Sequence, residues 1–205
     1  MDYSQLASTE SIAKTAEALK ANRFSTVVTV ANGAAALEYI KENLPKGVSV
    51  MNGASRTLEQ IGFVDYLKGG AHGWNNLHAA IVAETDPAKQ AELRRNSVSS
   101  DYYLGSVHAV TETGELVISS NTGSQLPHLA FTSQNLVLVV GTQKIVPTLA
   151  EAMTRFEYIL PLENENMMQK YGVGTQRNKT LILHGESGFT KRNVTILFVN
   201  EKLGF

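Results

Sequence analysis

Hydrophobic positions near the start of the chain repeat first with a helical period and then as a continuous run. Ile12, Ala16 and Leu19 are spaced at i, i+4 and i+7, which places them on one stripe of a helix predicted over Ser8–Asn22. The next segment, Ser25–Ala31, is largely apolar and β-branched. Such a run is typical of a strand that is covered on both faces.

A strand–helix–strand unit follows from the same pattern. Asn32 comes directly after the first strand and is a suitable N-cap for a helix predicted over Ala34–Asn43. A turn at Leu44–Gly47 then leads into a second buried strand, Val48–Met51. The connection is long enough for a right-handed crossover between parallel strands.

The rest of the chain continues this alternation, except that the stretch Gly62–Ala83 gives no clear pattern. The remaining expected elements are a short helix carrying Leu58 and Ile61, a helix from Asp86-Pro87 to about Val98, strands Tyr102–Thr111 and Glu115–Ile118 joined as a hairpin, a short helix Thr122–Phe131, strand Asn135–Gly141, a helix opened by Pro147 and ending near Tyr158, a weaker helix Asn164–Tyr171, and strands Thr180–His184 and Val194–Asn200. We therefore predict an α/β protein with a mostly parallel sheet flanked by helices, built as one domain over residues 1–205 with a helical lead-in over about 1–24.

Composition narrows the classes of partner and compartment. Eighteen basic and nineteen acidic residues give a net charge of −1, which disfavours nucleic acid as the main partner. Cysteine is absent, so this chain supplies no thiolate to a disulfide, a zinc site or an iron–sulfur cluster. The longest apolar runs, such as Leu136–Val140, are far shorter than the ~20 residues of a membrane span. No signal-peptide pattern opens the chain, and we expect a cytoplasmic protein with no membrane partner.

Four separated stretches are the most specific motifs in the chain. They are Asn52–Gly62 (NGASRTLEQIG), Ser100–Val117 (SDYYLGSVHAVTETGELV), Asn121–Ser124 (NTGS) with Leu136–Gly141 and Gln143–Pro147 after it, and Val199–Phe205 (VNEKLGF). Together and in this order they resemble the LUD domain family, whose best-known members are lactate-utilisation accessory proteins.

The resemblance implies a fold shared with ribose-5-phosphate isomerase and the coenzyme A transferases. It also implies a link to the oxidation of L-lactate to pyruvate, in which family members act with iron–sulfur partner proteins. Longer relatives carry several cysteines in the region that corresponds to Pro161–Lys179, and this chain has none there. We therefore expect an accessory subunit without a cluster of its own, and the resemblance implies no cofactor.

The turn Asn52–Thr57 is the first candidate ligand site. It follows a predicted parallel strand and precedes a helix, a position where open α/β sheets collect ligands and where free backbone N–H groups attract anions. Gly53 lets the backbone approach a ligand, Ser55 and Thr57 offer hydroxyl groups, and Arg56 can pair with a phosphate or carboxylate. The simpler interpretation is a tight turn in which serine caps the helix.

A second small, polar turn is formed by Asn121, Thr122, Gly123 and Ser124. The implied fold would bring it to the same edge of the sheet as the first turn, where both would line one pocket for a small anion. Lys144, just beyond the strongest strand, would reach the same cleft. Simple helix capping and a solvated loop lysine are the alternatives.

Glu112 and His108 are the candidate catalytic residues. Glu112 follows a predicted strand, and a partly buried carboxylate there would serve as a base or nucleophile, although an exposed hairpin turn is the simpler interpretation. His108 lies in the predicted strand beside Ser106. The five histidines show no metal-ligand spacing, so we expect no metal site.

Three functions stay open at this point. The first is the lactate-utilisation accessory subunit, and the second is an independent enzyme or binding module for a phosphorylated sugar, a coenzyme A derivative or a nucleotide-like ligand. The third is a structural module that self-associates through Gly69–Trp74, which would make the protein a homo-oligomer. The residues do not decide whether any bond is made or broken.

Overall fold

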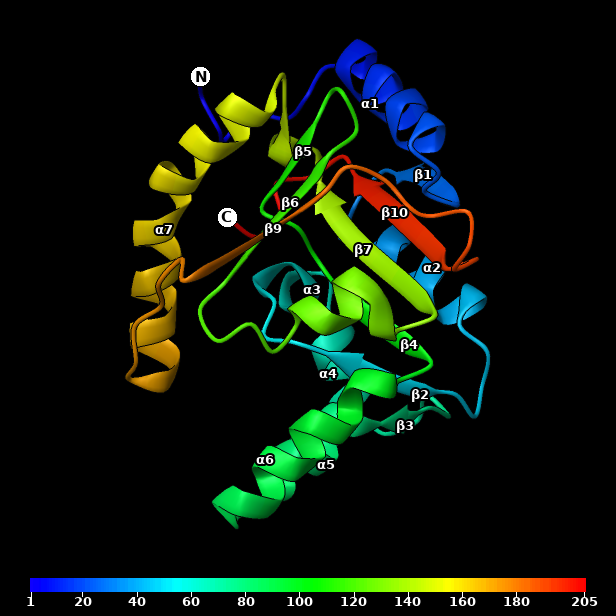
Figure 1. The fold of residues 1–205 in the computed structure, drawn as a ribbon, viewed down its shortest axis with the longest axis vertical. Helices are drawn as coiled ribbons and strands as arrows, with labels where there is room; N and C mark the ends of the chain where they lie inside the picture. Colours follow the sequence, from blue (N-terminus) through cyan, green and yellow to red (C-terminus); the bar gives the residue numbers. More distant parts are fainter.

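A computed structural model describes residues 1–205 and is built around a six-stranded sheet in which every neighbouring pair is parallel (Figure 1). The strand order is β1-β10-β7-β4-β2-β3. The strands are β1 (Thr26–Val30), β10 (Asn193–Val199), β7 (Asn135–Gly141), β4 (Tyr102–Gly105), β2 (Ser49–Asn52) and β3 (Asn75–Asn76). This confirms the predicted α/β class with a mostly parallel sheet.

A second, four-stranded sheet lies across one face of the first. Its order is β8-β5-β6-β9, with strands β8 (Ile145–Val146), β5 (Ala109–Thr111), β6 (Leu116–Ser120) and β9 (Lys179–Leu183). Strands β5 and β6 pair antiparallel around the turn 112–114, which confirms the predicted hairpin. Strand β9 forms one edge of this sheet and pairs antiparallel with β6.

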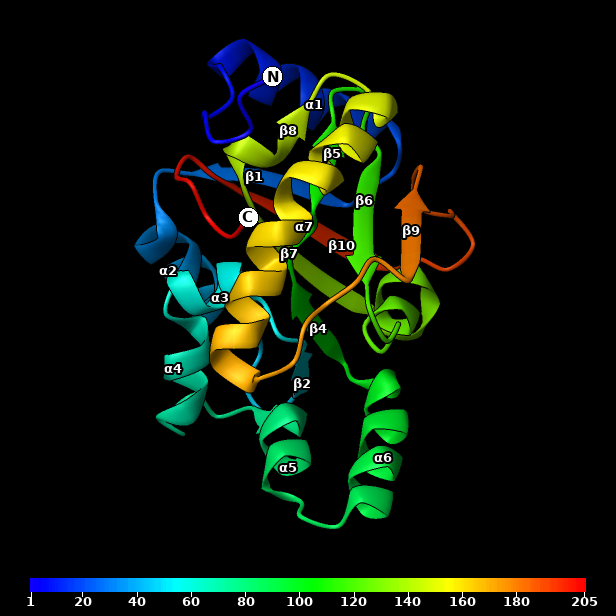
Figure 2. The same cartoon turned by 90° about the vertical axis from the view of Figure 1, so that its left-hand side faces the viewer.

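The helices complete the layers on both sides (Figure 2). One outer face of the parallel sheet is covered by α2 (Gly33–Asn43), α3 (Arg56–Gln60) and α4 (Phe63–Lys68). Helix α1 (Thr9–Ala21) packs at the opposite face, and the long helix α7 (Leu149–Tyr171) lies on the outer side of the second sheet. Helices α5 (Leu77–Ala83) and α6 (Pro87–Asn96) form a hairpin that projects from the body.

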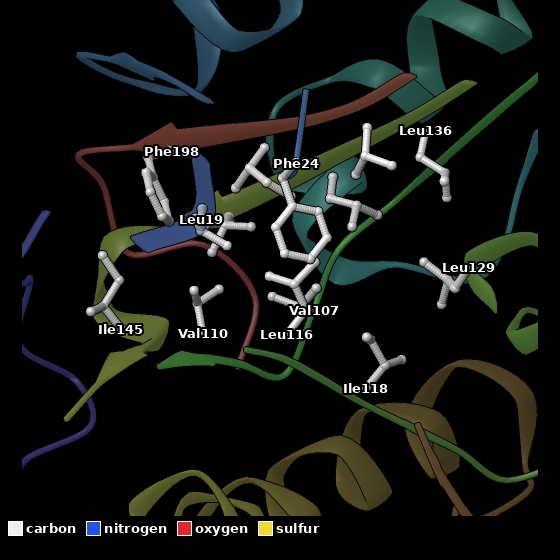
Figure 3. Packing of buried hydrophobic residues seen from close by; sticks show 14 of the residues in the cluster. Leu19, Phe24, Val107, Val110, Leu116, Ile118, Leu129, Leu136, Ile145 and Phe198 are labelled. Carbon is white, nitrogen blue, oxygen red and sulfur yellow. The ribbon is translucent and has the colours of Figure 1, made fainter. Parts of the chain in front are cut away.

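The alternating side chains of β7 explain why this strand occupies the centre. Leu136, Leu138 and Val140 enter the core between the two sheets, whereas Val137 and Val139 face α2 and α3 on the other side. Figure 3 shows Phe24 between side chains of both sheets in the first of these cores. Each such buried side chain contributes about 1.5–3 kcal/mol to folding, so the continuous apolar run specifies a strand with both faces covered.

Local capping fixes the helix starts that the sequence predicts. The side chains of Ser8, Asn32 and Asp86 each accept a hydrogen bond from a backbone N–H group in the first turn of α1, α2 and α6. These bonds satisfy donors that have no partner within the helix. The N-cap predicted at Asn32 and the helix start predicted at Asp86-Pro87 are therefore confirmed, and Ser8 caps the helix that was predicted to begin there.

One of the predicted strands differs from the structure. The expected strand Tyr102–Thr111 divides into β4 of the parallel sheet and β5 of the second sheet, so His108 lies in the connection and not in a strand. Strand β1 is covered on both faces, by α1 and by α2, as predicted, but it is an edge strand that pairs only with β10, and its residues are half-buried. A one-dimensional pattern cannot reveal a chain that moves from one sheet to another.

The predicted break in the helix after Tyr158 is also wrong. Helix α7 does not end there. It is 23 residues long in total, contains Pro161, and is capped by Gly172 in the left-handed conformation. Proline removes one helical hydrogen bond, but packing of the apolar stripe of α7 on the second sheet outweighs that loss. The continuation of the helix brings Glu163, beyond Pro161, to within 2.9 Å of His108.

The region Gly62–Ala83, which gave no clear pattern, forms α4, the short strand β3 and α5. Trp74 within it is 7% exposed and packs against Phe63, Tyr66 and His72. No helix of the protein combines the length and the apolar character needed to cross a membrane.

Candidate functional site

A buried lysine lies at the carboxyl end of the central strands. Strand β7 ends at Gly141, and a single helical turn, Thr142–Lys144, directs Lys144 back under the sheet edge. Its Nζ atom donates to Thr57 Oγ1, Ser106 Oγ and the Val107 carbonyl oxygen, each at 3.1 Å. All three partners are neutral oxygens, and the residue is only 4% exposed.

This environment changes the acid–base behaviour of Lys144. Burial, helped by the nearby Arg155 guanidinium, lowers the pKa of Lys144 to about 7, while the Glu163 carboxylate acts in the opposite direction. A large fraction of the amine is therefore neutral at physiological pH. A neutral amine carries a lone pair and can act as a nucleophile or a base.

The partners of Lys144 accommodate both of its protonation states. The Val107 carbonyl can only accept, and the Ser106 hydroxyl already donates to the Val139 carbonyl at 2.6 Å. Thr57 is therefore the partner that can reverse its role, accepting from the ammonium and donating to the lone pair of the amine. The site holds the nitrogen in place whether or not it is charged.

The segment Leu203–Phe205 covers this nitrogen. Gly204 has φ +70° and lies so close that a β-carbon on it would be 2.8 Å from Lys144 Nζ. The segment is held by polar contacts: the Gln143 amide donates to the Leu203 carbonyl at 2.7 Å, and the Gly204 N–H donates to Gln60 Oε1. Just before it, Glu201 accepts from the Gly33 N–H at 2.8 Å at the start of α2.

Arg155 is the second buried cation of the site. It comes from α7, has no exposed surface, and donates through Nη1 to the His108 carbonyl and through Nη2 to the Phe205 oxygen at 2.8 Å. Its Nε atom is buried without a hydrogen-bond partner. Burial lowers the pKa of Arg155 to about 10, so the guanidinium remains charged at neutral pH.

His108 and Glu163 form a pair beside these cations. His108 Nδ1 accepts from the Ser119 N–H at 3.0 Å, so the proton of the neutral ring lies on Nε2, which is 2.9 Å from Glu163 Oε1. Burial alone raises the pKa of Glu163, but the hydrogen bond from His108 and the charges of His108, Lys144 and Arg155 lower it overall. Glu163 is therefore the anion that balances the buried positive charge.

A surface hollow of about 370 Å³ opens on the outer side of the covering segment. Gly204 and Phe205 form part of its wall, and its charged residues are Arg56, Lys202 and Glu165. Gly204 thus separates the hollow on one side from Lys144 on the other.

The first predicted turn lies partly at this site. Thr57 contacts Lys144, and Arg56 lines the hollow while pairing with Glu59 at 3.4 Å. Ser55 caps α3 by accepting from the Leu58 N–H, as in the simpler interpretation.

The other two residues of that turn lie away from Lys144. Asn52 is buried with no partner on its Oδ1 atom, and a β-carbon on Gly53 would be 3.1 Å from the Tyr103 hydroxyl. Neither residue lines the hollow. A ligand-binding role for them stays a prediction.

The second predicted turn does not follow a strand of the parallel sheet. Asn121 to Ser124 come after β6 of the second sheet, so they are not a second corner at the carboxyl edge of the first. Asn121 accepts from Asn178 at 2.6 Å, the Thr122 and Ser124 hydroxyls bond each other, and Gly123 lies beside the Lys179 side chain. The Gln125 side chain reaches toward Gly53, which is where the two turns approach each other.

Glu112 lies on the hairpin turn between β5 and β6, where it faces α1. It accepts from Ser11 at 2.7 Å and from Lys14 at 2.8 Å, and these bonds lower the pKa of its carboxyl group. This arrangement fits a turn that anchors α1. No group of three or more His, Asp or Glu side chains is placed to hold a metal ion.

Sequence reasoning missed Arg155 and Glu163, and it named Ser106 only as a neighbour of His108. A signal existed for Arg155, because it falls on the same helical stripe as the buried residues Ala152, Phe156 and Ile159. A charged residue at a core position of a helix is uncommon unless its charge is paired or used. Glu163 was hidden because Pro161 suggested that the helix had already ended.

The fold and this site define an α/β protein with a buried lysine at the carboxyl edge of a parallel sheet. A model of the LUD domain family matches residues 12–199, and the chain therefore belongs to the LUD domain family. The crystal structure of a DUF162 family protein from Deinococcus radiodurans is similar, with a TM-score of 0.54, 13% identity, and coverage of 95% of this chain and 99% of that chain. A search of curated proteins gave no significant match.

Proposed function

We propose that this LUD domain protein takes part in L-lactate utilisation as an accessory subunit that binds a small carboxylate at the Lys144–Arg155 site. Family membership supports the link to lactate utilisation. The buried guanidinium of Arg155, with the partly protonated amine of Lys144 near it, supports a negatively charged ligand. The segment Leu203–Phe205 covers both side chains, and Arg155 donates a hydrogen bond to its Phe205 oxygen.

The buried guanidinium of Arg155 carries the proposal. Arg155 donates to the Phe205 oxygen through one nitrogen and to the His108 carbonyl through another, and it has no exposed surface. A buried guanidinium is normally paired with an anion or fully hydrogen-bonded, because desolvation of an unpaired charge is costly. A ligand carboxylate would pair with the guanidinium in place of the Phe205 oxygen.

Ligand binding is tested by thermal unfolding of the full chain with L-lactate, pyruvate, acetate or inorganic phosphate. A ligand at 100 times its dissociation constant should stabilise the wild type by ~2.7 kcal/mol. Arg155→Lys keeps the charge but removes the two-point geometry, so it should lose most of this stabilisation, and Arg23→Lys, at an exposed position, should retain it. Failure of every carboxylate to stabilise the wild type would reject the proposal.

The wider role predicts association with iron–sulfur proteins of lactate oxidation. Affinity purification from cells grown on L-lactate should recover such proteins with the tagged chain, and a deletion strain should grow poorly on L-lactate but normally on pyruvate. Normal growth of the deletion strain on L-lactate would exclude the role in lactate utilisation.

A further inference from the structure

We propose that the outer edge of β9 is a docking site at which an extended, acidic segment of another protein adds as a further strand of the second sheet. Strand β9 (Lys179–Leu183) is the last strand of this sheet and pairs only with β6. Figure 2 shows β9 at the end of the sheet, beyond β6. Docking at this edge requires no ligand at Lys144 or Arg155.

Two residues of β9 direct their backbone groups away from the sheet. Val117 of β6 lies opposite Ile182, and its carbonyl accepts from the His108 N–H at 3.0 Å, so the backbone groups of Val117 face β5. Two opposite residues of an antiparallel pair either both face each other or both face away. Ile182 therefore points its N–H and C=O groups outward, and so does Thr180 two residues earlier. No backbone hydrogen bond other than those to β6 reaches residues 179–183.

Strand β9 lacks the features that usually protect an edge. Edge strands are normally short, bulged or interrupted by proline or charged residues, because a free edge can pair with another chain. The edge strands β3 and β8 have only two residues each. Strand β9 has five residues in continuous register with β6, contains no proline, and carries its one charge at the first position, Lys179. Strand β1 has the same length but carries no charged residue that would select a partner.

The charge around β9 selects an acidic partner. Residues 172–192 hold four basic side chains and one acidic side chain, which gives this stretch a net charge of +3 in a protein whose net charge is −1. Arg177 and Arg192 are paired with carboxylates, but Lys179 and Lys191 are exposed and form no ion pair. These lysines would attract an acidic segment, whereas a second copy would set one positive stretch against another.

The side chains of β9 define the centre of the partner segment. Leu181 and Leu183 pack against the core between the two sheets, and Ile182 packs on the other face against the cluster beneath α7. All three are only half-buried. An added strand would place its own alternating side chains beside them on both faces. The expected partner therefore has β-branched or other apolar residues at its centre and Asp or Glu at its ends, and it binds by strand addition.

Docking is tested with the full chain and a fluorescein-labelled peptide, Asp-Glu-Val-Thr-Val-Glu-Asp. Fluorescence anisotropy at low salt should show saturable binding, and a peptide with lysine in place of every acidic residue should bind at least about tenfold more weakly. Amide exchange measured by NMR gives the register. The Thr180 and Ile182 N–H groups should exchange rapidly in the free protein and become protected by the acidic peptide, whereas the Leu181 N–H should be protected in both states.

Two sets of variants separate the backbone from the charge. Thr180→Pro removes an outward N–H group and leaves the bonds to β6, because proline is tolerated where the N–H of an edge strand faces solvent. It should weaken binding by about tenfold or more. Lys179→Gln combined with Lys191→Gln should weaken binding and flatten its salt dependence. Lys46→Gln combined with Lys89→Gln removes two exposed lysines elsewhere and should retain both properties.

Selective binding of the acidic peptide with new protection at Thr180 and Ile182 supports the docking site. Absence of binding, equal affinity for the acidic and basic peptides, or binding that leaves both amides unprotected overturns it. A dimer in solution with both amides protected before peptide is added also overturns it, in favour of self-pairing. If Thr180→Pro fails to fold, the lysine variants and the exchange of the wild type still decide.

Discussion

Gly204 and Lys144 are in direct contact although they lie far apart in the chain. A β-carbon at Gly204 would be 2.8 Å from Lys144 Nζ, and it would also collide with the Thr57 hydroxyl. Glycine is thus required twice at this position, once for the close approach and once for a φ of +70°. The contact makes the covering segment part of the candidate site.

Replacing this glycine should loosen the segment. Gly204→Ala is expected to lower the free energy of unfolding by about 2–3 kcal/mol, because it adds a steric conflict to the backbone strain of a positive φ. Chemical denaturation measures the loss. The matched control is Gly172→Ala, which has a φ of +67° with open space around it and should cost only about 1 kcal/mol. Equal losses in the two variants would contradict a tight contact at Lys144.

The buried lysine should make stability depend on pH. The pKa of Lys144 is about 7 in the folded protein and ordinary in the unfolded chain, so the unfolded chain binds more protons between pH 7 and about 10. Wild-type stability therefore gains from rising pH in this window, and Lys144→Met lacks that gain. The advantage of Lys144→Met over wild type should be greater at pH 6.5 than at pH 9, by on the order of 2 kcal/mol.

Urea denaturation at the two pH values measures this difference. Lys68→Met serves as the control, because the Lys68 side chain is 74% exposed and its substitution should give nearly the same change at both pH values. A Lys144→Met difference that stays constant with pH would show that the lysine is charged in both states.

The sequence was sufficient to predict the α/β class with a mostly parallel sheet because its strongest signals are local. The apolar run of β7, the cap Asn32 and the helix start at Asp86 each act within a few residues, and each was predicted. The transfer of the chain between sheets after Gly105 could not be predicted, because it depends on which distant strands are available for pairing.

The site was only partly predictable for the same reason. Lys144 was a candidate, but its burial depends on Thr57 and Ser106, which are 87 and 38 residues away. Its position in the sequence, after a strand and near polar residues, equally fits a solvated loop lysine. Arg155 could have been found from its place on an apolar helix stripe, whereas the role of Gly204 required the folded contact.

Trp74 should contribute to the core and not to self-association. It is 7% exposed and packs between Phe63, Tyr66 and His72, so Trp74→Ala should lower the free energy of unfolding by about 3–5 kcal/mol. Light scattering should give the same molar mass for the variant as for wild type under conditions where both are folded. A change of molar mass without loss of stability would support the self-association hypothesis.

The negative charge of Glu163 should influence the pKa of Lys144 without a direct hydrogen bond between the two side chains. That charge raises the pKa of Lys144, so Glu163→Gln should lower that pKa. The measurement is the pH dependence of acylation at Lys144 by an amine-selective reagent, followed by peptide mapping, and the midpoint should move to lower pH. Glu157→Gln removes the same charge from an exposed position of α7, 68% exposed, and should leave the midpoint in place. A merely structural role of Glu163 would alter stability without moving the midpoint, and a midpoint that rises would contradict the effect of the Glu163 charge on Lys144.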